Sequence, residues 1–233
     1  MKIKQHFVPK ALLKANLFAL IILTFTAIPA YSQNATPLML AAKNGNDWQL
    51  AKLISSGADL QERDAEGWTA LMYAVRYQQD SNIVKTLIDN GALIRVRNTY
   101  NFTPLLIASL YTQNPDILAM MLKDRNGAEE EVFNAFILSI VSNEVTDDIR
   151  FEKNRLFLEK EVSINAFWKG LTPLMYACKY SSTTAIIKQL LEYGANTSIR
   201  NKDGKTAFDY AQENQSLLHD ETYWSLTTNR NAK

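Results

Sequence analysis

The chain has 233 residues, of which 47% are hydrophobic and 21% charged, so its composition is that of a folded protein and excludes full-length disorder. Lys and Arg number 25 against 24 Asp and Glu, and without the first 32 residues the acids are in excess by three. This balance argues against nucleic acid as a partner. A single cysteine excludes an intramolecular disulfide and a cysteine-rich zinc site.

The N-terminus has the pattern of a cleaved export signal. Four lysines precede the apolar run Leu17–Ile28, and Ala30 and Ser32 place small residues at the −3 and −1 positions before Gln33. The uncharged stretch is shorter than the roughly 20 residues of a membrane-spanning helix, and an uncleaved anchor is the alternative. We expect residues 1–32 to be removed, which leaves a chain of about 201 residues without a membrane segment.

A short segment that begins with threonine recurs at a spacing of about 34 residues, or twice that, with Leu or Phe two residues later and Ala five residues later. Its five copies begin at Thr36, Thr69, Thr103, Thr172 and Thr206. A Gly-Ala pair closes the units at similar spacing, at Gly57, Gly91, Gly127 and Gly194, and Glu161 falls midway in the last gap. Six repeats are predicted, at about 34–63, 64–97, 98–128, 129–165 (eroded), 166–200 and 201–228, with a tail at 229–233.

Each repeat is predicted to contain two helices. The threonine is an N-cap whose hydroxyl accepts from the first free amides, and a proline after it sits where its missing N–H costs nothing. Apolar spacing such as Ile83, Val84, Leu87 and Ile88 indicates the second helix. Glycine then ends that helix in the left-handed conformation. One such unit cannot bury its apolar face, so the units are expected to stack.

The pattern Gly-x-Thr-Pro-Leu-x-x-Ala, followed by an Ile/Val-x-x-Leu-Leu helix and Gly-Ala, resembles the ankyrin repeat family over about residues 34–228. The resemblance implies an all-α solenoid of helix-turn-helix units joined by hairpin-like loops. It also implies partner binding through the loop tips and the exposed side of the first helices. The fourth repeat lacks Thr-Pro-Leu and carries extra acidic residues. The sequence therefore gives its weakest support for regular stacking at this repeat.

Aromatic residues recur on the surfaces that the resemblance assigns to binding. Some lie at the end of the first helix, some one turn earlier on the same face, some directly before the threonine and some at loop tips. These rings are Trp68, Tyr73, Tyr77, Tyr100, Phe102, Tyr111, Trp168, Tyr176 and Tyr180. Tyr and Trp are enriched in binding hot spots, so all nine are candidate protein-binding residues, with packing between repeats as the alternative.

Little in the sequence favours an enzyme. No catalytic, cofactor-binding or metal-ligating residue is predicted, because phosphate-binding glycine motifs and nucleophile elbows are missing. His219 is the one histidine outside the signal, and a hydrolase that uses it as a base is the least favoured alternative. Cys178 directly follows a helix alanine and is expected to be buried.

Together these features predict a monomeric, non-enzymatic, exported module that binds another protein and needs no cofactor. The periplasm of a bacterium is the expected location, with secretion to the medium as the alternative. Two narrower roles stay open. One is a periplasmic immunity or protective protein that neutralises a toxin or shields an enzyme, and the other is a secreted effector directed at a host.

Overall fold

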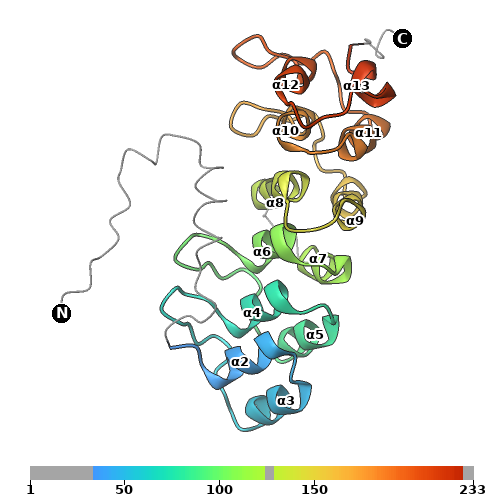
Figure 1. Ribbon diagram of the computed structural model, residues 1–233. Coiled ribbons are helices and arrows are strands. Elements are labelled where there is room, and N and C mark those ends of the chain that lie inside the picture. The colour runs from blue at the N-terminus through green and yellow to red at the C-terminus, as the bar shows by residue number, and fades with distance from the viewer. Residues whose placement is uncertain (1–33, 124–128, 228–233) are drawn as a thin grey trace, which may run out of the picture.

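The computed structural model describes residues 34–123 and 129–227; the predicted signal and Gly127 lie outside these ranges. Within them the regular elements are helices, arranged in two layers along an elongated stack (Figure 1). The first helices are α2 (Pro37–Asn44), α4 (Ala70–Tyr77), α6 (Pro104–Tyr111), α8 (Glu129–Val141), α10 (Pro173–Tyr180) and α12 (Ala207–Glu213). The second helices are α3 (Asp47–Ser55), α5 (Ser81–Asp89), α7 (Pro115–Met121), α9 (Asp147–Leu158), α11 (Ala185–Glu192) and α13 (Glu221–Ser225). The predicted all-α solenoid is confirmed.

The helix ends follow the predicted capping chemistry. In α2, α4, α6, α10 and α12 the threonine before the helix accepts a hydrogen bond from the backbone N–H three residues later. Gly57, Gly91 and Gly194 follow second helices with φ of +84°, +96° and +89°, a conformation that glycine adopts without strain. Each such end turns the chain sharply toward the next loop.

The core runs along the stack between the two helix layers. The first helices pack on one another in order from α2 to α12, and each of them up to α10 also packs on the second helix of its own repeat. Contacts therefore join mainly neighbouring units. The methionines three residues after a capping threonine, Met39, Met72 and Met175, are buried, with at most 1% of their surface exposed. The thioethers of Met39 and Met175 accept from the backbone N–H of their capping threonines, Thr36 and Thr172.

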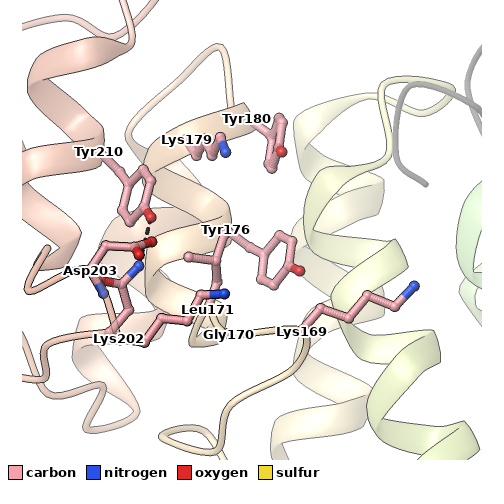
Figure 2. A pocket seen from close by; sticks show the side chains of 10 residues that line it. Lys169, Gly170, Leu171, Tyr176, Lys179, Tyr180, Lys202, Asp203 and Tyr210 are labelled. Atoms are coloured by element: carbon pink, nitrogen blue, oxygen red, sulfur yellow. Dashed lines mark hydrogen bonds between the residues drawn. The ribbon is translucent and has the colours of Figure 1, made fainter. Parts of the chain in front are cut away.

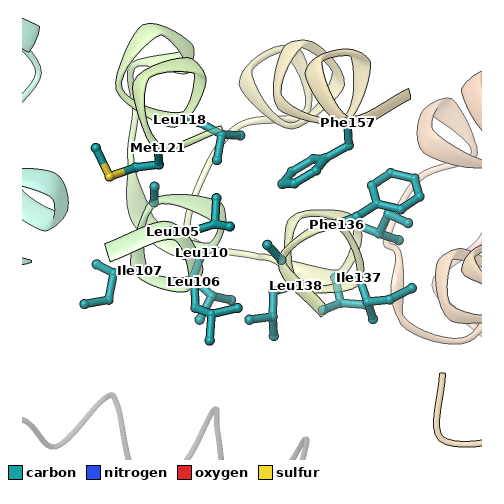
Figure 3. Packing of buried hydrophobic residues seen from close by; sticks show 14 of the residues in the cluster. Leu105, Leu106, Ile107, Leu110, Leu118, Met121, Phe136, Ile137, Leu138 and Phe157 are labelled. Atoms are coloured by element: carbon teal, nitrogen blue, oxygen red, sulfur yellow. The ribbon is translucent and has the colours of Figure 1, made fainter. Parts of the chain in front are cut away.

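The eroded fourth repeat stacks on both neighbours. Helix α8 packs against α6 and α10, and α9 packs against α7 and α11. Figure 3 shows Phe136 and Phe157 side by side between α8 and α9, with Leu118 of α7 facing Phe157 and Leu138 pointing toward Leu106 of α6. The two phenylalanine ring centroids lie 5.5 Å apart. Apolar packing therefore replaces the missing threonine cap in holding this unit.

Most loops between repeats share one construction. Asp64, Asn98 and Asn201 stand five residues before a capping threonine, and each side-chain Oδ1 accepts from the backbone N–H groups two and four residues later. The fifth repeat differs. There Lys169 and Gly170 take φ of +47° and +86°, and Trp168 pairs with Leu171 across a two-residue hairpin turn.

Candidate protein-binding surface

Burial divides the nine predicted rings into two groups. Trp68, Tyr73, Phe102 and Tyr176 are only 3%, 6%, 7% and 4% exposed. These four belong to the core and present almost no surface to a partner, which corrects their place among the candidate binding residues. Their size explains the difference, because a large ring at these positions fills the space between two repeats.

The other five rings reach the surface. Tyr77 and Tyr100 are 39% and 44% exposed. Tyr111, Trp168 and Tyr180 are half-buried. Burial raises the pKa of Tyr111 to about 12, although Arg76 beside it acts in the opposite direction. Tyr111 is thus partly a packing residue, whereas Tyr77 is the more available ring.

The exposed rings rest on the buried ones. Tyr77 stacks on Tyr73 with centroids 6.2 Å apart, and Tyr73 packs against Trp68 at 5.5 Å. The hydroxyl of Tyr73 donates to Asp64 Oδ2 at 2.8 Å, so the loop carboxylate fixes the ring beneath. We call Trp68, Tyr73, Tyr77 and Tyr111 the first aromatic cluster.

A second cluster repeats this arrangement three repeats further along. Tyr180 stacks on Tyr176 at 6.0 Å, and Tyr176 packs against Trp168 at 5.5 Å. The tryptophans come from different sequence positions, five residues before Tyr73 and eight before Tyr176, and the hairpin turn of the fifth repeat brings Trp168 into place. Together with Tyr210, these rings form the second aromatic cluster.

Cations line both clusters. Lys43 lies 4.8 Å from the Tyr77 centroid, and Arg76 lies 5.4 Å from the same ring. Lys179 lies 5.2 Å from the Tyr180 centroid and 5.3 Å from that of Tyr210. Contacts of this kind hold both the cation and the ring in place.

These cations were not predicted, although the sequence carries a signal for them. Lys43, Arg76 and Lys179 all stand seven residues after a capping threonine, next to the position that holds Tyr77 and Tyr180. Tyr210 was not predicted either, although it occupies the position of Tyr73 and Tyr176, four residues after the threonine. It is 6% exposed, and Asn201 donates to its hydroxyl at 2.8 Å.

A pocket of about 240 Å³ opens at the second cluster, between the loops and first helices of the fifth and sixth repeats. Figure 2 shows Tyr176, Tyr180 and Tyr210 around it, with the Lys179 chain between two of the rings. Its other lining residues are Lys169, Gly170, Leu171, Asn201, Lys202 and Asp203.

The remaining chemistry-bearing residues have packing partners. His219 stacks on Tyr223 with centroids 4.2 Å apart, next to Trp224. Cys178 is fully buried, as expected from the sequence, and burial raises the pKa of its thiol. Across residues 34–123 and 129–227, no group of three His, Cys, Asp or Glu side chains could hold a metal, and no helix has the length and apolarity to cross a membrane.

Comparisons with solved structures place this fold among known repeat proteins. The ankyrin repeat protein EF0377 is 30% identical with a TM-score of 0.61, over 76% of this chain and 90% of that one. A chain in the complex of a predatory endopeptidase from Bdellovibrio bacteriovorus with an immunity protein is 25% identical with a TM-score of 0.56, over 77% of this chain and 92% of that one. The ankyrin repeat domain of Bcl-3 shares the fold at 22% identity and a TM-score of 0.61, over 77% of this chain and 80% of that one.

Curated relatives share the repeats but are much longer. The mitochondrial disaggregase of Bos taurus is 31% identical over 199 residues, and that of Homo sapiens is 27% identical over 210 residues. Each match covers 85% of this chain, which spans only about a quarter of either relative, 24% and 27% of their lengths. The family model described as ankyrin repeats (3 copies) matches residues 19–134 and 149–228, most of the sequence. The chain therefore belongs to the ankyrin repeat family and is a protein-binding module of that kind.

Proposed function

We propose that this chain is an exported, non-enzymatic protein that recognises its partner with the exposed rings and cations of its two aromatic clusters. The observation that carries the proposal is the setting of Tyr77. Its ring is 39% exposed, yet it is held by Tyr73 beneath it and by Lys43 and Arg76 beside it. A large ring that is fixed before binding loses little conformational freedom when a partner covers it.

Tyr180 supports the same interpretation from the fifth repeat. It stacks on Tyr176 and lies beside Lys179, as Tyr77 stacks on Tyr73 and lies beside Arg76. Two such settings on first helices of one stack suit a partner that spans several repeats.

The proposal is tested with single variants of the two rings. We expect Tyr77→Ala and Tyr180→Ala to weaken binding by about 2 kcal/mol each, near thirtyfold, and to cost only about 1 kcal/mol of folding stability. The partner is first captured from native extract with the mature chain and identified by mass spectrometry, and its affinity for each purified variant is then measured.

Tyr193→Ala is the matched control. Tyr193 is 43% exposed, much like Tyr77, but it ends the second helix α11 and belongs to neither cluster. If the control weakens binding as much as the two cluster variants, or if the variants unfold while the remaining folded protein still binds normally, the clusters are structural and recognition lies elsewhere.

Export is the second part of the proposal, and it rests on the signal pattern of residues 1–32. We expect the mature protein to begin near Gln33 and to be found in the periplasm. N-terminal sequencing after cell fractionation checks this. A chain that begins at Met1 or Lys2 contradicts export by cleavage, and protein in the culture supernatant favours the host-directed role.

One narrower role has a specific observation in its favour. The chain is similar to a chain in a complex of an endopeptidase with an immunity protein. We therefore keep as a second candidate that this chain binds an enzyme and blocks or protects it. If the captured partner is a hydrolase, its turnover should fall when the purified chain is added in equal amounts. Unchanged turnover restricts the proposal to binding.

A further inference from the structure

The pocket between the fifth and sixth repeats has more positive than negative side chains. Lys169, Lys179 and Lys202 line it, against Asp203 as the single carboxylate. The mature chain as a whole is slightly acidic, so this local excess is not a consequence of composition. Three tyrosine rings provide much of the remaining wall, together with Gly170, Leu171 and Asn201.

The Lys179 amine is held in place by aromatic rings. Lys179 Nζ lies between two rings, 5.2 Å from the Tyr180 centroid and 5.3 Å from the Tyr210 centroid. Tyr210 is itself fixed by its hydrogen bond with Asn201. Figure 2 shows the Lys202 chain reaching toward the Tyr176 side of the pocket, whereas the Lys169 chain runs away from it.

These cations have no carboxylate partner in the described part of the chain. The ion pairs of the described residues are formed by other cations. One of these is the nearby Lys205, which pairs with Glu213. Hydrogen bonding to Glu213 raises the pKa of Lys205, whereas loss of water contact lowers the pKa of Lys169.

We propose that this pocket binds a carboxylate side chain, Asp or Glu, from an acidic segment of the partner protein. The inference rests on the proposed function and states the chemistry that the second aromatic cluster recognises. A carboxylate that enters the pocket meets the Lys179 amine, which is held between the rings of Tyr180 and Tyr210, and the exposed Lys202 beside it. Charge-assisted hydrogen bonds of this kind are stronger than those between neutral groups.

A protein carboxylate suits this site better than a nucleic acid. Nucleic-acid binding depends on a broad basic surface that contacts many phosphates, and the chain has an excess of acids once the first 32 residues are set aside. The positive charge here is confined to one pocket and matches one or two acidic side chains.

The experiment titrates the mature chain with an end-blocked hexaglutamate peptide at low salt. Backbone amide resonances in 169–180 and 201–210 should shift and saturate, and hexalysine of the same length should leave them unchanged. The double variant K179Q/K202Q should weaken hexaglutamate binding at least tenfold, whereas K179R/K202R should retain most of it. Melting temperatures of all variants establish that they fold.

Lys188→Gln is the matched control, because Lys188 is exposed on α11, in the same repeat but outside the pocket. It should change hexaglutamate affinity less than twofold. Equal losses in the control and the double variant, no saturable shift, or tighter binding of a single-stranded oligothymidine than of hexaglutamate would each overturn the inference. Any of these results leaves the proposed function standing if Tyr77→Ala still lowers the affinity for the partner. The proposed function itself fails if no ring variant changes that affinity.

Discussion

The guanidinium carbon of Arg76 lies 3.9 Å from the ring centroid of Tyr111, so a cation from the second repeat rests on an aromatic ring of the third. The same guanidinium lies 5.8 Å from the centroid of Trp68. Helices α4 and α6 are therefore joined at the surface by a cation–aromatic contact, in addition to the apolar packing between them.

Replacing Arg76 by Met should lower the free energy of unfolding by about 1–2 kcal/mol, because the contact with Tyr111 is lost while much of the aliphatic packing is kept. Urea unfolding measures the change. Lys85→Met is the control: Lys85 pairs with Asp89 on an exposed helix face, where 63% and 56% of the two side chains are accessible, and its loss should cost under about 0.5 kcal/mol. Equal effects in both variants would show that the ring contact adds nothing specific.

The repeat chemistry was predictable because it is local. Thr172 caps a helix and Gly194 ends one for reasons contained within a few residues of sequence. Ring exposure was not predictable in the same way. Whether Tyr73 or Tyr77 is covered depends on the neighbouring repeat, and Trp168 reaches Tyr176 only because Lys169 and Gly170 form a tight turn. The pocket at the second cluster depends on the relative placement of two repeats, which a one-dimensional pattern does not contain.

Glu161 takes a backbone conformation that suits glycine. Its φ is +58°, and its place in the sequence pattern falls midway between Gly127 and Gly194. The left-handed conformation costs a residue with a side chain about 1 kcal/mol, so Glu161→Gly should stabilise the protein by a similar or slightly smaller amount. Glu159→Gly is the control, because its φ is −65° and glycine brings no relief there. Thermal melts should move in opposite directions for the two variants.

Lys153 predicts a dependence of stability on pH. Its side chain is fully buried, its Nζ donates to the Thr112 carbonyl at 3.4 Å, and burial with repulsion from Arg150 lowers its pKa to about 7. Asp147 does not raise the pKa of Lys153 again, because its carboxylate pairs with Arg150 at 3.1 Å. An unfolded lysine titrates near pH ~10.4, so the folded state disfavours the charged form, and the penalty is complete below about pH 7.

Stability should therefore rise as the pH increases from about 7 toward 10. Lys153→Met should remove this contribution and stabilise the protein at pH 7 by about 1–4 kcal/mol. Urea unfolding of both proteins at several pH values isolates the effect as their difference, and Lys188→Met, on an exposed position, should show none. A constant difference across this pH range would mean that Lys153 keeps its proton in the fold.

Cys178 should be unreactive in the native protein. Its side chain is fully buried in α10, and burial raises the pKa of the thiol, so thiolate is scarce and shielded. A thiol-specific reagent at neutral pH should label it only at the rate of unfolding and at once in denaturant. Rapid labelling under native conditions would show that the fifth repeat opens locally.

Amide exchange should locate the weakest part of the stack in the fourth repeat. Helix α9 lacks a side-chain hydrogen bond at its N-cap Thr146. It also buries Arg150 and Asn154 with polar atoms that have no hydrogen-bond partner. Such groups favour local opening, because opening returns them to water.

We expect amides in α9 to exchange faster than those in α5 of the second repeat, where Ile83, Val84 and Leu87 are buried and Asp80 caps the helix. Mass spectrometry of exchanged, digested protein resolves the two helices. Arg150→Leu together with Asn154→Leu should slow exchange in α9 and leave α5 unchanged; faster exchange in that variant would show that the buried polar side chains hold the repeat together.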